Sequence, residues 1–393
     1  MTPSLSRRGL LGLTASSLTA GCSASALSET DRSFPDTDWP MTGRDSQNTA
    51  FVPDATVPAD LEEQWSVPLS NWPVTSPVVA DGTVYVGAQD ELHAYRADDG
   101  ERRWTAELPH ETFGTPAVDV GSRTVYATSS GDRDDQPAEV VAVDTERGER
   151  RWQTTVGEES VYAVRLHDGD VFVRTEDACV SLDSGGAVRW RHDGLGPVGN
   201  EEYNVNGLRA GDVAPAVTDD RVYVTADSAL LTLDRATGEE LWRVPVEHAY
   251  GGPAVGDGVV YVQGYLSAKA VSVDGEVLWT RDRGALWQPA VADDAVFLEA
   301  DDVAEVDPET GETRWTYDVR TDVVAATPVV LGEHVLCVGV RSGALARERA
   351  WFGLGGRARW LLDERPSDIL SPAVGAGQLF LVMPFSDRLV AYA

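Results

Sequence analysis

The stretch AVDTERGERRW, residues 142–152, holds the pattern that decides the fold. An alternating apolar run ends at an Asp, a turn containing Gly follows, and a second run then brings a Trp. Alternation with a period of two is typical of strands, and a Gly-containing turn joins two strands into a hairpin. The Gly adopts a positive φ at little cost, and the Asp side chain can accept hydrogen bonds from turn amides. We therefore predict a hairpin whose outer strand carries Trp152.

The same phrase recurs along the chain and is clearest in LDRATGEELW (residues 233–242) and VDPETGETRW (residues 306–315). Successive copies of its Trp stand 36 to 52 residues apart, which is the period of a four-stranded propeller blade. We expect each indole to be buried between adjacent blades, where its truncation costs several kcal/mol. These docking tryptophans are Trp65, Trp104, Trp152, Trp190, Trp242, Trp279, Trp315 and Trp360.

A second short phrase, such as SPVV (residues 76–79) or GPAV (residues 252–255), precedes each unit. Its small residues suit inner strands that crowd around a central channel. Its Pro marks where the chain enters the sheet, because Pro donates no ladder hydrogen bond. The third unit departs from this pattern and has Tyr162 in place of the Pro.

The two ends of the chain indicate how the ring closes. EEQWSVPL (residues 62–69) is an outer strand without a blade, and the last unit stops at Ala393 without an outer strand. Pairing of the two removes exposed sheet edges. We predict an all-β fold over residues 39–393: an eight-bladed β-propeller of four-stranded antiparallel blades, closed by pairing of the N- and C-terminal strands. An open solenoid or two stacked sandwiches is the alternative.

The units resemble the pyrroloquinoline-quinone (PQQ)-type propeller repeats of quinoprotein dehydrogenases and of BamB-like assembly lipoproteins, over residues 39–393. The stretch WPMTGRDSQNT (residues 39–49) is similar to the segment that precedes the first blade in that family. For a dehydrogenase, the resemblance implies a quinone over the channel, calcium or a lanthanide on oxygen ligands, an Asp base and often two adjacent cysteines. For a BamB-like protein it implies a non-catalytic scaffold. The repeats indicate the fold more strongly than the chemistry.

Catalytic motifs are absent from the sequence. It has no adjacent cysteines, HExxH, GxSxG or phosphate loop, its six histidines are scattered, and the acidic loops 130–139 and 199–212 lack EF-hand spacing. Cys179 and Cys337 stand in apolar stretches that we expect to be strands of blades three and seven, too far apart for a disulfide. We predict no catalytic residue, no metal and no cofactor, with PQQ plus calcium as the alternative.

The N-terminus indicates where the protein works. Arg7 and Arg8 resemble a twin-arginine export signal, and residues 19–22 (TAGC) resemble a lipobox with Thr19 where Leu is usual. The apolar run between them is too short for a membrane span. We predict a signal peptide over residues 1–21, lipidation at Cys22, a flexible tether over residues 22–38, and anchoring by the lipid alone to the outer face of the cytoplasmic membrane.

The charge is strongly acidic, with 64 Asp and Glu against 32 Lys and Arg, and Lys269 is the single lysine. A chain that starts at Cys22 keeps 30 basic side chains against 64 acidic ones, which gives −34. Repulsion of this size is tolerated when salt near 1 M shortens the Debye length to about 3 Å. We predict an extremely halophilic, archaeal source. A basic ligand is the alternative explanation, and nucleic acid is disfavoured as a partner.

Aromatic residues just before the inner strands define a candidate binding site at one mouth of the channel. Trp and Tyr are favoured anchors at interaction surfaces. The alternative is that these rings fill the funnel between blades. The candidate mouth residues are Trp72, Phe113, Tyr162, Tyr250 and Trp287.

The sequence therefore favours an extracytoplasmic, lipid-anchored propeller that acts as a non-catalytic protein-binding or assembly scaffold. We expect a monomer that binds an unknown membrane or exported protein. The alternatives are a quinone-dependent oxidoreductase or quinone sensor, and a carbohydrate- or peptide-binding lipoprotein.

Overall fold

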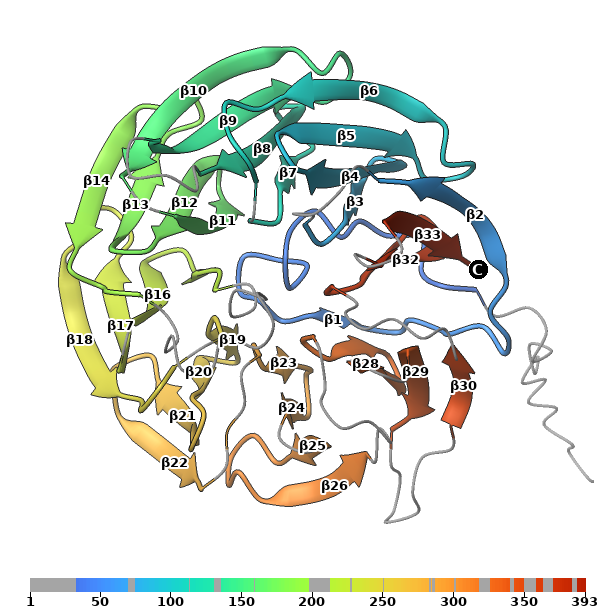
Figure 1. The fold of residues 1–393 in the computed structure, drawn as a ribbon. Coiled ribbons are helices and arrows are strands. Elements are labelled where there is room, and N and C mark those ends of the chain that lie inside the picture. Colours follow the sequence, from blue (N-terminus) through green and yellow to red (C-terminus); the bar gives the residue numbers. More distant parts are fainter. Residues whose placement is uncertain are drawn as a thin grey trace, which may run out of the picture.

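The computed structural model is a ring of eight blades around a central channel, as predicted (Figure 1). It describes residues 33–69, 75–112, 114–130, 136–158, 160–197, 213–226, 228–249, 251–282, 284, 287–299, 302–317, 326–339, 343–349, 358–362, 370–383 and 387–393. These residues form strands and turns with no helix, so none of them belongs to a helix that could cross a membrane. The predicted all-β fold is confirmed.

Each blade is built from consecutive strands, numbered from the channel outward. Blade 1 holds β3 (Val78–Ala80), β4 (Thr83–Ala88), β5 (Glu91–Arg96) and β6 (Arg102–Glu107). Blade 2 holds β7 (Ala117–Asp119), β8 (Thr124–Ser129), β9 (Ala138–Asp144) and β10 (Arg150–Gly157). Blade 3 holds β11 (Val161–His167), β12 (Asp170–Thr175), β13 (Ala178–Leu182) and β14 (Val188–Asp193). Blade 4 holds β15 (Ala216–Val217), β16 (Arg221–Ala226), β17 (Ala229–Asp234) and β18 (Glu240–Pro245).

The second half of the ring repeats this order. Blade 5 holds β19 (Ala254–Gly256), β20 (Val259–Gln263), β21 (Ala268–Ser272) and β22 (Val277–Arg281). Blade 6 holds β23 (Ala290–Val291), β24 (Val296–Glu299), β25 (Val303–Val306) and β26 (Thr313–Tyr317). Blade 7 holds β27 (Val329–Leu331), β28 (His334–Gly339), β29 (Gly343–Glu348) and β30 (Ala358–Leu362), and a fifth strand, β1 (Phe51–Val52), pairs parallel to β27 on the channel side.

Blade 8 closes the ring with strands from both ends of the chain. It holds β31 (Ala373–Gly375), β32 (Gln378–Met383) and β33 (Arg388–Tyr392), and its outer strand is β2 (Glu63–Pro68). In the β2–β33 register, Trp65 lies opposite Ala391. The predicted closure is therefore confirmed, and the last blade is held by residues from opposite ends of the sequence.

The innermost strands are short because a Pro precedes seven of them. In those blades the strand begins only after the Pro and spans two or three residues. Blade 3 has Tyr162 instead, and its inner strand β11 extends over seven residues, Val161–His167. Two charged side chains on strands of this blade, Arg165 on β11 and Arg174 on β12, are fully buried.

The repeated tryptophans dock each blade onto the next one. The indole N–H of Trp190 donates to the Arg235 carbonyl (2.7 Å), and its ring lies against Gly238 in the hairpin turn of blade 4. Trp65, Trp104, Trp152, Trp242 and Trp279 make the same pair of contacts with the carbonyls of Ala97, Thr145, Ser184, Val273 and Pro308 and with Gly100, Gly148, Gly186, Gly275 and Gly311. Trp315 is half-buried, and the side chain of Trp360 lies outside the described residues.

The channel is filled by the protein's own N-terminal residues. Residues 34–57, here called the central segment, run once around the inside of the ring (Figure 1). Their carbonyl oxygens accept hydrogen bonds from backbone amides of seven blades. In blade order from blade 8, the pairs are Gly377 with Pro35, Ala376 with Thr37, Val79 with Trp39, Val118 with Pro40, Val217 with Ser46, Val255 with Gln47, Val291 with Thr49, Val330 with Ala50 and Gly332 with Val52.

Candidate functional site

A buried Arg of blade 3 fixes the middle of the central segment. Arg165 donates to the carbonyls of Thr42, Asp45 (2.8 Å) and Pro215 (3.1 Å) and to the side-chain oxygen of Asn48. The side-chain amide of Asn48 in turn donates to the carbonyls of Ala214 (3.0 Å) and Pro253 (2.7 Å), just before the inner strands of blades 4 and 5. Buried polar groups are stable only when they are hydrogen-bonded, and this network satisfies the guanidinium with acceptors of the segment that it holds.

Little space remains in the described part of the channel. A cavity of about 10 Å³ is left there, about enough for one water molecule. Small-molecule sites are typically about 300–1,000 Å³ in volume. The residues around the cavity also provide no carboxylate for a metal ion: they are Trp39, Thr42, Gly43, Ala50, Ser76, Pro77, Thr115, Thr327, Val329, Ser371 and Pro372. This part of the channel does not fit a tricyclic quinone with its metal.

Two of the predicted mouth aromatics lie among the described residues, and both are half-buried. The ring of Tyr162 lies under the guanidinium of Arg174, 5.6 Å from ring centroid to Cζ. The backbone of Trp287 packs on the chain entering blade 5, since a Cβ at Gly251 would lie 2.5 Å from its carbonyl carbon. The other three, Trp72, Phe113 and Tyr250, lie outside the described residues, as do Arg7, Arg8 and Cys22.

Arg174 organises the loops at the rim of blade 3. It is fully buried and donates to the carbonyls of Thr175, Glu176 (3.0 Å), Gly196 (2.8 Å) and Thr225 (3.2 Å). Burial lowers the pKa of Arg174 to about 10, so the guanidinium remains charged at neutral pH. Arg174 thereby ties the β12–β13 turn to the chain leaving β14.

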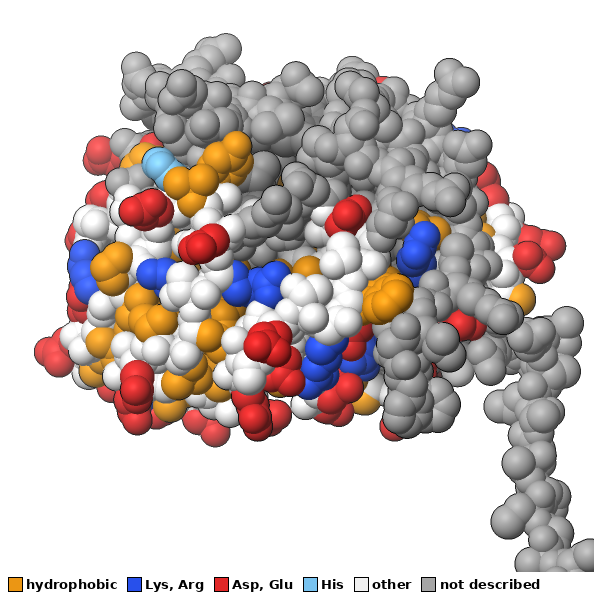
Figure 2. Space-filling model, turned by 90° about the horizontal axis from the view of Figure 1, so that it is seen from below, with side chains coloured by type: hydrophobic (Ala, Val, Ile, Leu, Met, Phe, Trp, Pro, Cys, Tyr) orange, Lys and Arg blue, Asp and Glu red, His pale blue; other side chains and the backbone are white. Residues whose placement is uncertain are grey.

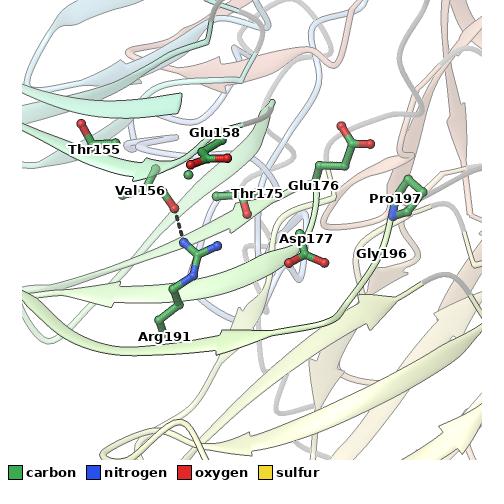
Figure 3. Close-up of a pocket in the computed structure, with 10 residues that line it drawn as sticks. Thr155, Val156, Glu158, Thr175, Glu176, Asp177, Arg191, Gly196 and Pro197 are labelled. Carbon is green, nitrogen blue, oxygen red and sulfur yellow. Dashed lines mark hydrogen bonds between the residues drawn. The ribbon is translucent and has the colours of Figure 1, made fainter. Parts of the chain in front are cut away.

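An acidic groove opens between these two segments and the end of β10 in blade 2. Its volume is about 490 Å³, and Figure 3 shows Glu158, Glu176 and Asp177 around one space. The guanidinium of Arg191 donates to the Val156 carbonyl and pairs with Asp193. The full lining is Thr155, Val156, Gly157, Glu158, Thr175, Glu176, Asp177, Arg191, Gly196 and Pro197. With three carboxylates and one guanidinium, the groove suits a cationic segment of a partner.

Comparison with known families accounts for the repeat pattern. The sequence profile described as "Outer membrane protein assembly factor BamB" matches residues 54–136, 120–200 and 180–392. The chain belongs to this family. The predicted resemblance to PQQ-type, BamB-like repeats is thereby confirmed.

Individual relatives agree with this assignment. The BamB of Yersinia pestis is 25% identical over 297 residues, which cover 70% of this chain and 72% of that protein. The solved BamB of Moraxella catarrhalis is similar with a TM-score of 0.66 and 17% identity, over 85% of this chain and 97% of that one. A quinohemoprotein alcohol dehydrogenase from Pseudomonas putida has a TM-score of 0.68 at 13% identity, over 90% of this chain and 80% of that one. Identities this low show a shared fold alone.

The two described thiols and His93 of this BamB-family chain are poorly placed for chemistry. Cys179 and Cys337 are unpaired and lie in blades 3 and 7, on opposite sides of the ring, as expected. Burial raises the pKa of both thiols to about 12, so neither is a nucleophile. Burial also lowers the pKa of His93 to about 4, which leaves it neutral.

One histidine meets two carboxylates on the surface. His167 Nε2 lies 3.2 Å from Asp219 Oδ1 and 3.6 Å from Asp168 Oδ2. Among the described residues this is the one group of three potential metal ligands. Asp168 and Asp219 are the ordinary turn residues between first and second strands, a position that Asp81 and Asp257 occupy in other blades. The repeat therefore accounts for both carboxylates of the cluster, because each one is the turn Asp of its own blade.

The buried arginines that hold the central segment and the rim of blade 3 were not predicted from the sequence. Arg165 and Arg174 were not singled out, although an Arg within the apolar text VYAVRL was a visible signal. The segment 39–49 was predicted to precede the first blade, and it does so in sequence. Its place inside the channel was not predicted, because the contacts that hold it come from blades far along the chain.

Proposed function

We propose that this protein is a non-catalytic scaffold that binds a membrane or exported protein through the outer surface of its ring. The observation that carries the proposal is that the central segment fills the described part of the channel, where a cavity of about 10 Å³ remains, far smaller than a typical small-molecule site. Membership of an assembly-factor family supports a protein partner. The acidic groove between blades 2 and 3 is the proposed contact site, and the ring works as a monomer without a cofactor.

The proposed location is the outer face of a cytoplasmic membrane. The support is the sequence: Arg7 and Arg8 resemble an export signal, and Cys22 stands where a lipobox cysteine would be modified. With Cys22→Ser, the protein should move from the membrane fraction to the soluble fraction. Ser25→Ala in the proposed tether is the control, and an unchanged membrane fraction for Cys22→Ser would refute the anchor.

Purification from native membranes in mild detergent at high salt, followed by mass spectrometry, tests the scaffold. A stoichiometric protein partner is expected. The double variant Glu158→Gln/Asp177→Asn should lower partner recovery by roughly tenfold, because removal of charge pairs at an interface costs about 1.4 kcal/mol or more. The variant Asp60→Asn/Glu309→Gln makes the same charge change at exposed positions elsewhere and should leave recovery unchanged.

The same purification distinguishes the alternatives. Co-purification of quinone with calcium, together with a quinone absorption band, would overturn the scaffold and make the protein an oxidoreductase or sensor. Bound carbohydrate or peptide in place of a protein would favour capture by the aromatic mouth. Recovery of no partner, with no small molecule, would also contradict the proposal.

A further inference from the structure

Negative charge alone does not distinguish the acidic groove from the rest of the surface. The chain has 64 acidic side chains. Figure 2 shows them spread, with Arg or Lys between them, over the wall of the ring that contains β22 and β26. A partner segment that selects the groove therefore has to recognise carboxylates at fixed positions as well as their charge.

The propeller fold does not require Arg174, the buried residue next to the groove. Arg174 is the fifth residue of β12, and the equivalent residue in the second strands of the other seven blades is Gly, Thr, Gln, Glu or Val. Those blades form the same sheets without an Arg at this place. Burial of a charged group costs free energy unless hydrogen bonds compensate for it. A fully buried Arg at this position in blade 3 alone therefore indicates a role that is local to blade 3.

The guanidinium of Arg174 binds three separate segments, one through each of its nitrogen atoms. Nη1 donates to the carbonyls of Thr175 and Glu176 at the β12–β13 turn. Nη2 donates to the carbonyl of Gly196 in the chain leaving β14, and Nε donates to the carbonyl of Thr225 in blade 4. The turn and the chain leaving β14 are two of the three chain segments that line the groove. One side chain therefore sets the relative position of these two segments.

Two further contacts complete the arrangement. The ring of Tyr162 lies under the guanidinium of Arg174, 5.6 Å from ring centroid to Cζ, where a cation and an aromatic ring attract each other. At the third segment, Arg191 on β14 donates to the Val156 carbonyl near the end of β10, the bond drawn in Figure 3. Bonds from side chains of blade 3 to backbone carbonyls therefore hold all three segments of the groove.

We infer that Arg174 is a positioning residue for partner binding. It holds the turn that carries Asp177 so that this carboxylate and Glu158 of blade 2 face the same space, as Figure 3 shows, and meet a cation of the partner together. The inference rests on the proposed function, because the groove has to be the contact site. A Lys at position 174 would keep the charge, but its single nitrogen cannot bind all three segments.

The variant Arg174→Lys tests the inference in the detergent purification described above. Partner recovery per ring should fall roughly tenfold, as for loss of the charges themselves. Arg165→Lys is the matched control, because Arg165 is equally buried on the adjacent strand of the same blade but binds the central segment instead of the groove. The control should lose stability and keep partner recovery.

Tyr162 provides a second test that does not change a buried charge. Tyr162→Leu removes the ring under the guanidinium and should lower partner recovery by about threefold, the factor expected for loss of an exposed cation–π contact. Tyr162→Phe keeps the ring and should keep the wild-type recovery. Equal recovery from the Leu and Phe variants would contradict the inference, and this pair decides the question if Arg174→Lys does not fold.

A double-mutant cycle separates positioning from a general loss of stability. In the Glu158→Gln/Asp177→Asn background, Arg174→Lys should lower recovery by less than about twofold more, because the carboxylates that it positions no longer carry charge. The same loss in both backgrounds, or the same loss for Arg165→Lys, would overturn the positioning role.

The inference and the proposed function fail in different ways. If Glu158→Gln/Asp177→Asn lowers recovery and a folded Arg174→Lys does not, the positioning role is wrong and the contact site stands. If the wild type recovers a partner that none of these variants affects, the groove is not the contact site and both are wrong. If the wild type recovers no partner, the scaffold and the inference fall together.

Discussion

Gly238 is constrained twice, by its own backbone and by a neighbour. Its φ is +72°, and a Cβ there would lie 2.6 Å from the ring of Trp190 in the preceding blade. Gly258 has nearly the same φ, +75°, but no atom lies within 4 Å of its missing Cβ. The Gly of the repeated phrase is thus required by the turn and also by the docked Trp.

These two glycines separate the backbone effect from the packing effect. Gly258→Ala should lower the free energy of unfolding by about 1 kcal/mol, the ordinary cost of a left-handed backbone with a Cβ. Gly238→Ala should lower it by about 2–4 kcal/mol, because displacement of the indole adds a cost of about 1–3 kcal/mol. Urea unfolding at constant salt measures both. Equal losses would mean that the ring of Trp190 can move aside freely.

Glu299 makes stability depend on pH. It is buried, one of its carboxyl oxygens has no hydrogen-bond partner, and burial raises its pKa well above the usual range. The native state therefore keeps a proton that the unfolded chain releases above an ordinary Glu pKa of about 4.3. Stability is greatest below that value and falls as the pH rises toward the native pKa.

Glu299→Gln should remove this dependence, since the amide is nearly isosteric and stays neutral. Wild type should lose stability relative to the variant as the pH rises above the ordinary Glu pKa of about 4.3, as measured by urea unfolding at fixed salt. Glu309→Gln, at an exposed turn position, is the control and should follow the wild-type curve. Parallel curves for wild type and Glu299→Gln would show that Glu299 is ionised in the folded protein.

At the scale of elements, the central segment connects seven blades through backbone bonds and the eighth through Arg165. Replacement by Met keeps the length of the side chain and leaves the carbonyls of Asp45 and Pro215 without this donor. We expect Arg165→Met to lower the free energy of unfolding by about 3–5 kcal/mol, the usual result of removing one partner of a buried charged network.

The control for Arg165→Met is Arg103→Met, which removes an exposed Arg and should cost less than about 1 kcal/mol. Urea unfolding measures both losses. Limited proteolysis with mass spectrometry provides a second readout, because loosening of the central segment should create cleavage sites within residues 34–57. A wild-type cleavage pattern for Arg165→Met would contradict the role of this residue.

The blades were predictable from sequence and the central segment was not, for a physical reason. Each blade is a series of hairpins in which paired strands are neighbours in the chain. Apolar–polar alternation, the turn Asp and the turn Gly therefore stand close together in the sequence. The turn hydrogen bonds expected of Asp234 are present, to the amides of Ala236 and Thr237. The central segment is held through its carbonyl groups, which every residue has, and its side chains follow no period.

The candidate site also depends on contacts that the sequence pattern does not predict. Tyr162 was singled out as a mouth aromatic, but its ring lies under Arg174, a contact that joins two strands of blade 3. The acidic groove depends on loop carbonyls gathered by Arg174, and no sequence pattern encodes which carbonyls a buried Arg will meet.

At the scale of the whole molecule, the strong negative net charge predicts that salt stabilises the ring. The chain carries 64 acidic and 32 basic side chains, a formal charge of −32 at pH 7. We predict that the melting temperature rises continuously as KCl is raised from about 0.1 M to about 3 M, because the Debye length falls from about 10 Å to below about 3 Å. Sucrose at matched osmolality is the control, and it should give a smaller rise. A maximum near physiological salt would contradict a halophilic source.

The path of the central segment also sets the order in which the molecule can be completed. The amide of Gly377 donates to the carbonyl of Pro35, so the hydrogen bond of one of the first described residues needs one of the last to be in place. On a ribosome, residues 34–57 emerge long before the strands of blade 8 exist. Completion of the ring therefore depends on contacts between residues far apart in the sequence, those of the central segment with blade 8 and those of β2 with β33, and contacts of this kind form slowly.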